Sequence, residues 1–275
     1  MLFGHHQLHD ESLLKGRLFQ FSRCSAPVFI VVVALIVCAN VVAAETPNPT
    51  INEILRYFSL TAFGTKDGNG DLRIKKWNRP IVVRVKGEFE NRDQWKVQEV
   101  ATELMRITSH SISVYNEEND QRKANINIVF TERNNFYDIV KIYDKRIYSK
   151  NHDKLKEVMK NNKIRDTVIC FGTIYPGFEH SVGFVLILIP NATLFDERAA
   201  CVEEELAQSL GLFNDSRLAT HSIFNDVSEH SSLTGHDKIL LRLLYHPEIK
   251  RGANQLEAIR AARNILRSSD VLKFQ

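Results

Sequence analysis

The residues best suited to chemistry lie in one stretch, residues 201–215, which reads Cys-Val-Glu-Glu-Glu-Leu-Ala-Gln-Ser-Leu-Gly-Leu-Phe-Asn-Asp. Glu204 and Gln208 are one helical turn apart, so in a helix their side chains point the same way. Asn214 would return to the same place if the chain turns back after the helix. One carboxylate and two amides suit calcium, magnesium or manganese better than zinc. Glu205, adjacent to Glu204, offers a second kind of site, a carboxylate pair for metal-independent acid–base chemistry.

The same stretch also has a purely structural interpretation. Acidic residues early in a helix complement its macrodipole by up to ~1 kcal/mol. Gln208 and Asn214 could hydrogen-bond the backbone of the following loop, Gly211 could end the helix, and Asp215 could brace the turn after it. Three interpretations therefore stay open: a polar-braced, non-catalytic helix, which we favour, a metal site of unusual composition, and an acid–base pair.

We expect this helix over residues 198–212. Hydrophobic periodicity also predicts the strands and helices that must hold it in place. The alternation of strands and helices indicates an α/β arrangement with one mixed sheet. The most apolar strand, residues 181–190, should lie near the centre of that sheet. The other expected strands are residues 80–89, 112–115, 124–130 and 166–171, and the other expected helices are residues 51–63, 93–108, 234–245 and 253–266.

The stretch resembles the zinc helix of the metzincin proteases, H-E-x-x-H-x-x-G-x-x-H, with its ligands replaced. Glu204, Gln208 and Asn214 stand at the three histidine positions, in the string Glu-Glu-x-x-Gln-x-x-Gly-Leu-x-Asn-Asp. Glu205 stands at the position of the general base, and Gly211 at that of the glycine. Without histidine ligands, the resemblance implies no ordinary zinc chemistry. We expect no cofactor, and a divalent metal on the three replaced positions is the alternative.

Segments further along the chain extend this resemblance. Matrixin-type zincins follow the zinc helix with a turn of roughly Ser-Ile-Met-Tyr, a Leu-x-x-x-Asp segment and a helix that ends in Leu-Tyr. The corresponding residues here are Ser222, Ile223, Phe224 and Asn225, then Leu233 to Asp237, then Leu243, Leu244 and Tyr245. His221, His230 and His236 lie near this turn, but their spacing matches no standard zinc site, and we expect surface or turn histidines.

With its opening Lys75-Lys76-Trp77-x-x-Pro80-Ile81, the chain resembles a secreted bacterial domain family of unknown function that has been grouped with the metallopeptidases. The resemblance spans residues 50–250. It implies a zincin-like α+β fold: a mixed twisted sheet, a backing helix and an active-site-type helix, followed by a helical C-terminal part. In zincins the edge strand beside the active-site helix pairs with extended substrate, and that strand should be residues 166–171 or its neighbour.

The N-terminal residues have the pattern of an export signal. Residues 28–39 are an unbroken apolar run that follows basic residues and precedes Val42-Ala43-Ala44. This predicts a signal peptide over residues 1–44, cleaved after Ala44, and a periplasmic or secreted protein. The run is shorter than the about 20 residues of a membrane-spanning helix. An uncleaved anchor over residues 28–44, and membrane attachment through it alone, is the alternative.

Export leaves two cysteines, Cys170 and Cys201, which an oxidising compartment should join as a disulfide. The exported chain divides into a zincin-like domain, residues 45–250, and a C-terminal helix, residues 251–275. The domain includes an inserted segment, residues 131–165, that is rich in Lys and Arg and should form a mainly helical surface element.

A net charge of +3 gives no reason to expect a nucleic-acid partner. The function that we predict is a non-catalytic, pseudoprotease-like module that binds a peptide or protein of the cell envelope along its edge strand. The first alternative is an atypical metallohydrolase or peptidase with Glu205 as general base. The second is a structural envelope protein whose cleft has closed.

Overall fold

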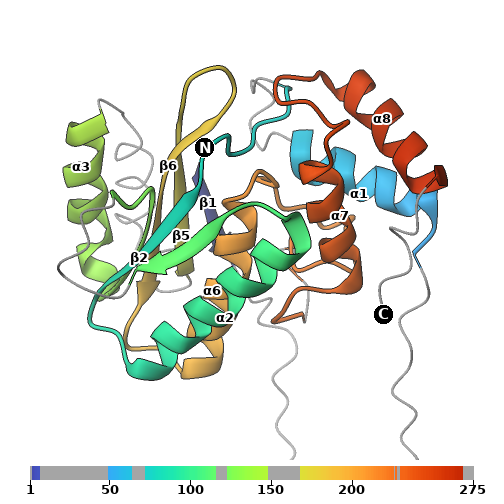
Figure 1. Cartoon of the computed structure of the whole chain (residues 1–275). Helices are drawn as coiled ribbons and strands as arrows, with labels where there is room; N and C mark the ends of the chain where they lie inside the picture. The colour runs from blue at the N-terminus through green and yellow to red at the C-terminus, as the bar shows by residue number, and fades with distance from the viewer. Residues whose placement is uncertain are drawn as a thin grey trace, which may run out of the picture. The chain divides into compact units, whose positions relative to one another are not determined.

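A single mixed sheet organises the protein (Figure 1). The computed structural model describes residues 2–6, 49–63, 72–115, 123–147, 168–225, 227 and 230–268. The six strands follow the order β1-β5-β6-β4-β2-β3 across the sheet. They are β1 (Leu2–His6), β2 (Ile81–Gly87), β3 (Ile112–Tyr115), β4 (Ile126–Thr131), β5 (Val168–Pro176) and β6 (Val182–Pro190).

Strand direction divides the sheet into two parts. Strands β3, β2, β4 and β6 are parallel to their neighbours, whereas β5 runs antiparallel to β6 and β1 runs antiparallel to β5. Strand β6 lies between β4 and β5, and its second half is completely buried. Burial on both faces explains its continuous apolar sequence. The predicted central strand and mixed sheet are confirmed.

Seven helical segments accompany the sheet in the described residues. Helices α2 and α6 lie side by side against one face of the sheet, and α1, α7 and α8 pack next to them (Figure 1). The segments are α1 (Ile51–Phe63), α2 (Asn91–Thr108), the 3₁₀ helix η1 (Arg133–Asn135), α3 (Phe136–Ile147), α6 (Phe195–Gln208), α7 (Gly235–Tyr245) and α8 (Gln255–Ser268).

The two faces of the sheet carry separate hydrophobic clusters. Alternate residues of β5 show this division, because successive side chains of a strand point to opposite faces. Cys170 and Ile174 belong to the large cluster beneath α1, α2, α6, α7 and α8. Phe171 and Tyr175 belong to the smaller cluster, to which α3 contributes the fully buried Val140. The first part of the predicted basic insertion therefore packs against the sheet.

Several expectations for the N-terminal residues fall outside the described part of the chain. The contacts group residues 1–7 with residues 49–275 and place residues 8–48 in a second unit. The predicted signal peptide with its apolar run, residues 28–39, and the remainder of the insertion, residues 148–165, are not among the described residues, apart from residues 2–6. Among the helices that are described, none has the length and hydrophobicity needed to cross a membrane.

Candidate functional site

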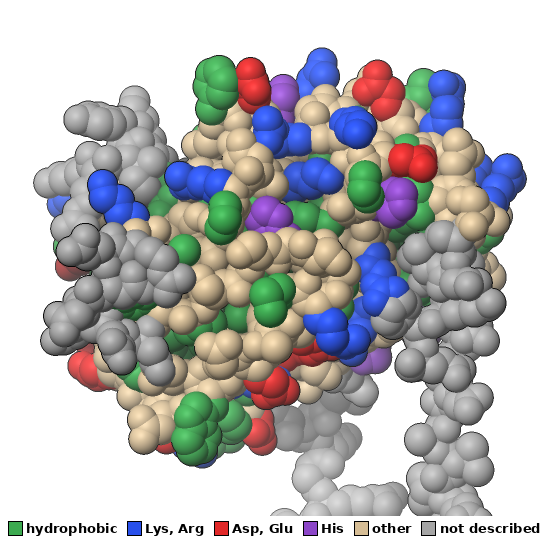
Figure 2. Space-filling model, in the orientation of Figure 1, with side chains coloured by type: hydrophobic (Ala, Val, Ile, Leu, Met, Phe, Trp, Pro, Cys, Tyr) green, Lys and Arg blue, Asp and Glu red, His purple; other side chains and the backbone are tan. Residues whose placement is uncertain are grey.

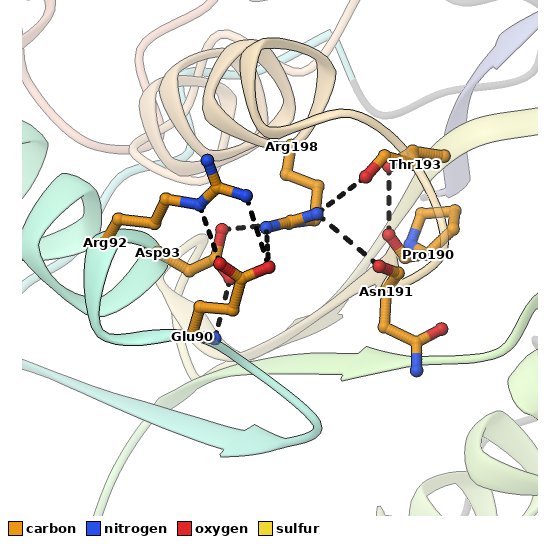
Figure 3. A network of polar contacts seen from close by, with 7 residues as sticks. All are labelled: Glu90, Arg92, Asp93, Pro190, Asn191, Thr193 and Arg198. Atoms are coloured by element: carbon orange, nitrogen blue, oxygen red, sulfur yellow. Dashed lines mark hydrogen bonds and ion pairs between the residues drawn. The ribbon is translucent and has the colours of Figure 1, made fainter.

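A buried arginine positions the start of α6. The guanidinium of Arg198 donates to Asp93 at 2.9 Å and to Glu90 at 2.9 Å, both at the start of α2. It also donates to the carbonyl of Thr193 at 2.6 Å, in the loop that leads from β6 into α6 (Figure 3). Asp93 in turn accepts the backbone N–H of Glu90 at 2.8 Å. This network joins the first turns of the two helices.

Glu203 ties the middle of α6 to two other elements. One carboxylate oxygen lies 2.8 Å from the ammonium group of Lys96 on α2. The other accepts the backbone N–H of Leu233 at 3.1 Å, immediately before α7. The Glu203 side chain is only 4% exposed, so the ion pair is well shielded from water. Glu203 therefore acts as a brace between α2, α6 and the loop before α7.

The structure buries all the residues at the positions of the metzincin ligands and base. Gln208 donates from Nε2 to a carboxylate oxygen of Asp215. Asn214 donates from both Nδ2 and its backbone N–H to the carbonyl of Thr61, at 3.0 and 3.1 Å. The amides at two of the three ligand positions thus connect the loop after α6 to the end of that helix and to α1. The exposed fraction is 6% for Glu204, 2% for Glu205, 1% for Gln208 and 5% for Asn214.

This arrangement bears on metal binding in the described residues. No group of three or more His, Cys, Asp or Glu side chains there is placed to hold a metal ion. Gln208 and Asn214 use their amide NH₂ groups in hydrogen bonds to protein oxygens, and these bonds hold the loop after α6. Glu204 and Glu205 lie on the buried part of α6, between the sheet and its neighbouring helices.

The turn formed by Ser222, Ile223 and Phe224 is held by one buried carboxylate. Asp237, in the first turn of α7, accepts the Ser222 hydroxyl and the Ile223 N–H. It also accepts the backbone N–H and hydroxyl of Thr234, both at 2.8 Å. Burial raises the pKa of Asp237, and these four donors act in the opposite direction. The Leu-x-x-x-Asp segment therefore fastens the turn to the start of α7.

A disulfide holds the middle of α6, and a glycine sets the path of the chain after its end. Cys170 on β5 and Cys201 on α6 are bonded, with 5.9 Å between their Cα atoms, as the sequence predicts. Gly211 has a φ of 136° and lies so close to Lys75 that a Cβ would collide with the Lys75 carbonyl oxygen. Only glycine fits that conformation and that approach. The helix is thus joined to the sheet at its middle and closely packed after its end.

A buried histidine was not expected from the sequence. His236 is 3% exposed, so the expectation of a surface or turn position is wrong for this residue. Its ring stacks on that of His221 at 5.3 Å between centroids, and its Nε2 lies 3.7 Å from Glu53. Tyr57 joins the group through a 3.3 Å hydrogen bond to Glu53. Burial lowers the pKa of His236, although Glu53 acts to raise it.

The disulfide joins strand β5 to α6. On its outer side, β5 pairs with β1. The pairing joins Leu2 to Thr173 and Phe3 to Gly172 in an antiparallel register. At the far end of β5 is a cavity of about 150 Å³. Its lining combines the ends of β5 and β6 with the loop after α6: Lys75, Ile174, Pro176, Ser181, Val182 and Phe213.

Comparison with known proteins identifies a family. No curated protein and no solved structure is significantly similar to this chain. A family model with the description "Protein of unknown function (DUF2927)" matches residues 52–264, from α1 into α8. The matched span includes the whole α6 helix, the disulfide and the turn held by Asp237. Since this span is well over half of its length, the chain belongs to the DUF2927 family.

Proposed function

We propose that the protein is an exported, non-catalytic module that binds an extended peptide segment of a protein in the cell envelope by adding it as a strand to β5. The observation that carries the proposal is the pairing of Leu2–His6 with β5. A sheet edge that accepts one extended segment through backbone hydrogen bonds can accept others, because those bonds do not depend on side-chain identity.

The position of β5 agrees with the resemblance to degenerate metzincins. That resemblance assigns peptide binding to the edge strand beside the active-site-type helix. Here β5 is linked to α6 by the bond between Cys170 and Cys201. Its partner β1 comes from the leader that the sequence predicts to be removed on export. In the exported protein, β5 would then be available to a ligand strand.

The small cavity near Phe213 supplies a basis for sequence preference. In the observed register Leu2 lies opposite Thr173, so a ligand that continues beyond Leu2 toward its own N-terminus passes Ile174 and then Pro176. Both residues line the cavity, together with Val182. An apolar side chain of the ligand would fill this space. Strand addition then provides affinity, and the cavity provides selectivity.

The hydrogen bonds of Gln208 and Asn214, which stand at two of the three metzincin ligand positions, support peptide binding without cleavage. A zincin-type hydrolase needs a metal and a general base exposed to substrate and water. Gln208 and Asn214 donate hydrogen bonds to protein groups, and Glu205 is 2% exposed. These residues stabilise the position of α6 behind β5. We therefore assign α6 a supporting role in peptide binding.

Fluorescence anisotropy tests the proposal with labelled peptides. The first peptide copies residues 1–7 and carries a dye at its C-terminus. Two longer peptides add Leu-Ala or Asp-Ala before that sequence, which sets Leu or Asp opposite Pro176. The proteins are the full chain and a chain that begins at Glu45, whose folding is checked by circular dichroism and thermal unfolding.

We expect saturable binding to the chain that begins at Glu45 and much weaker binding to the full chain, in which β1 competes at high effective concentration. The Leu-Ala peptide should bind more tightly than the Asp-Ala peptide. Val182→Asp, which changes the cavity lining, should remove that preference while leaving the binding of the shortest peptide. Equal binding by both proteins, or no saturable binding by the shorter one, would show that β5 does not receive peptides.

A further inference from the structure

One end of the molecule combines exposed apolar side chains with basic ones. The hairpin that joins β5 to β6 stands out from the sheet at this end (Figure 1), and its tip carries Phe178, which is 81% exposed. Leu72, before β2, and Leu256, in the first turn of α8, are 47% and 68% exposed. We call this end the tip surface, and it consists of residues 72–80, 176–182 and 248–257.

Hydrogen bonds hold the three segments of the tip surface together. Arg251 donates from Nε to the carbonyl of Glu179 at 2.7 Å, which joins the turn before α8 to the hairpin. The N–H of Gly252 donates to the carbonyl of Ile74 at 2.8 Å, and the N–H of Ile74 donates to the carbonyl of Ala253 at 2.9 Å. These two bonds join the same turn to the segment before β2. The exposed apolar side chains therefore belong to one continuous surface.

The tip of the hairpin is held in a strained conformation. Glu179 and His180 have φ values of 49° and 60°, in the left-handed region that favours glycine. The N–H of Ser181 closes the turn by donating to the carbonyl of Phe178 at 3.1 Å. The carboxylate of Glu179 lies 3.6 Å from the guanidinium of Arg251, which braces the turn from the neighbouring segment. Strain of this kind persists where the surrounding contacts hold it, so Phe178 is presented in a fixed position.

Basic residues surround these apolar side chains. Residues 72–80 read Leu-Arg-Ile-Lys-Lys-Trp-Asn-Arg-Pro, with four basic residues and no acidic one. Lys250 is exposed and has no ion pair with the described residues, and the side chains of Lys76 and Arg79 donate to backbone carbonyls. The pKa of Lys76 is lowered to about 8, first by burial and then by the charges of Lys250 and Arg251. These cations therefore lie close enough together to repel one another.

Acidic residues of the tip surface are fewer, and two of the three have local roles. Glu179 pairs with Arg251, and Glu257 accepts the backbone N–H of Asn254 at 2.9 Å at the start of α8. Glu248 is the third. In the upper part of Figure 2, Lys and Arg side chains predominate over Asp and Glu, and single hydrophobic side chains lie between them. The tip surface is therefore basic around its apolar side chains.

The alternative is that these side chains are ordinary surface residues. Single exposed apolar residues are common in soluble proteins and need no explanation. Trp95 of α2, which is 73% exposed, is an example. Two features distinguish the tip surface: Phe178 lies on a strained turn that Arg251 braces, and cations without a carboxylate partner adjoin it. A turn that only connects two strands requires neither feature.

We propose that the tip surface binds a phospholipid membrane that contains anionic lipids, with Phe178, Leu72 and Leu256 entering the boundary between headgroups and acyl chains. Arg79 and Lys250 face the anionic headgroups. Apolar side chains that enter this boundary beside cations that attract the headgroups are a common means of attachment to anionic membranes. The contact is separate from the predicted attachment through residues 28–44, and it does not rest on peptide binding by β5.

A tryptophan at the tip tests this proposal by reporting contact with acyl chains. The full chain with Phe178→Trp is mixed with vesicles whose acyl chains are brominated, made either of phosphatidylcholine and phosphatidylglycerol or of phosphatidylcholine alone. We expect the anionic vesicles to quench the added fluorescence and the neutral vesicles to quench it much less. At about 1 M salt, where the Debye length is about 3 Å, the quenching by anionic vesicles should be largely lost.

The wild-type chain is the control for its own tryptophans. Trp77 is buried, and Trp95 lies in the first turns of α2, which Arg198 ties to the end of β6. Phe178 precedes the start of β6, and a strand of that length spans about 30 Å. Wild-type fluorescence should therefore be quenched little. An equal response of the wild-type chain and Phe178→Trp would overturn the proposal, as would equal quenching by the two kinds of vesicle.

Charge variants separate the tip surface from general attraction to a basic protein. In the Phe178→Trp chain, Lys250→Glu should weaken binding to anionic vesicles at least about fivefold, which is the factor that one Lys near an anionic surface contributes. Arg267→Glu makes the same change at an exposed position in the last turn of α8, away from Leu256, and should leave the affinity unchanged. Circular dichroism and thermal unfolding check that both variants fold. Equal losses of affinity in the two variants, or no loss in Lys250→Glu, would overturn the proposal.

Discussion

Arg198 of α6 and Asp93 of α2 form a buried ion pair of 2.9 Å, although 105 positions separate them in the sequence. Their side chains are 4% and 2% exposed. The pair brings the first turns of two adjacent helices together, and Asp93 also holds the backbone N–H that precedes α2.

Removal of Arg198 should destabilise the protein strongly. Arg198→Met leaves the Asp93 carboxylate buried without its charged partner, which typically costs about 3–5 kcal/mol. Urea unfolding followed by circular dichroism measures the change in the free energy of unfolding. Arg92→Met removes an exposed arginine that contacts Glu90 at 2.7 Å, and should cost only about 0–1 kcal/mol. Similar losses in the two variants would show that the buried pair has no special importance.

The disulfide should stabilise the folded protein, because it restricts the conformational freedom of the unfolded chain. It spans 31 positions between Cys170 and Cys201, and closing a loop of that length stabilises the fold by about 3–4 kcal/mol. The variant with Cys170→Ala and Cys201→Ala should therefore unfold at a lower urea concentration than the oxidised protein. Reduced wild-type protein should behave like the variant. A reduced protein as stable as the oxidised one would contradict this expectation.

His236 should make the protein less stable in mild acid. Its folded pKa is below the ordinary value of 6.5 because the ring is buried, with Glu53, Tyr57 and His221 around it and Asp237 nearby. As pH falls below 6.5, the unfolded chain takes up a proton that the folded chain resists, so the free energy of unfolding decreases. This stability is present above pH 6.5 and is lost as pH falls through the folded pKa.

The test is the slope of stability against pH between pH 7 and pH 5, from urea midpoints. His236→Gln should flatten that slope, whatever its effect on stability at pH 7. His230→Gln, at an exposed position, should leave the slope as in the wild-type protein. An unchanged slope in His236→Gln would mean that the acid sensitivity arises elsewhere, for example at His110, whose pKa burial also lowers.

Elemental analysis of the purified full chain should find no stoichiometric divalent metal, before or after treatment with a chelator. The physical reason is that Gln208 and Asn214 are buried, and that no three His, Cys, Asp or Glu side chains of the described residues are grouped to hold a metal ion. One metal per chain that is lost in Glu204→Ala would contradict this prediction. It would favour the metallohydrolase with Glu205 as base.

Periodicity in the sequence was enough to predict most of the fold, because the main elements have simple patterns. The central position of β6 follows from its unbroken apolar run, which requires burial on both faces. The helix boundaries were less accurate: α6 begins at Phe195, three residues before its expected start at Arg198. The first turn carries Asp196 and Glu197 but few apolar residues, so its hydrophobic pattern is weak.

Much of the candidate site could not be predicted from the sequence, because it depends on contacts between distant residues. Glu203 looks like one more acidic residue of a helix, yet it joins Lys96 to the backbone of Leu233. The pairing of β1 with β5 involves residues that carry the pattern of a leader, and nothing in their sequence indicates a strand. The disulfide was predictable because the export signal, as interpreted from the sequence, would leave only two cysteines to combine.

The outer strand of the sheet has a consequence for self-association. An exposed strand edge is a template for other edges, including that of a second copy of the same chain. While Leu2–His6 cover β5, the edge of β5 itself is not available to a second copy, and β1 is the outermost strand. A form of the protein that lacks these residues would expose the edge of β5 to its own copies as well as to the peptides that we propose it binds. Self-association of this form should therefore increase with protein concentration, and a ligand bound to β5 should keep it monomeric.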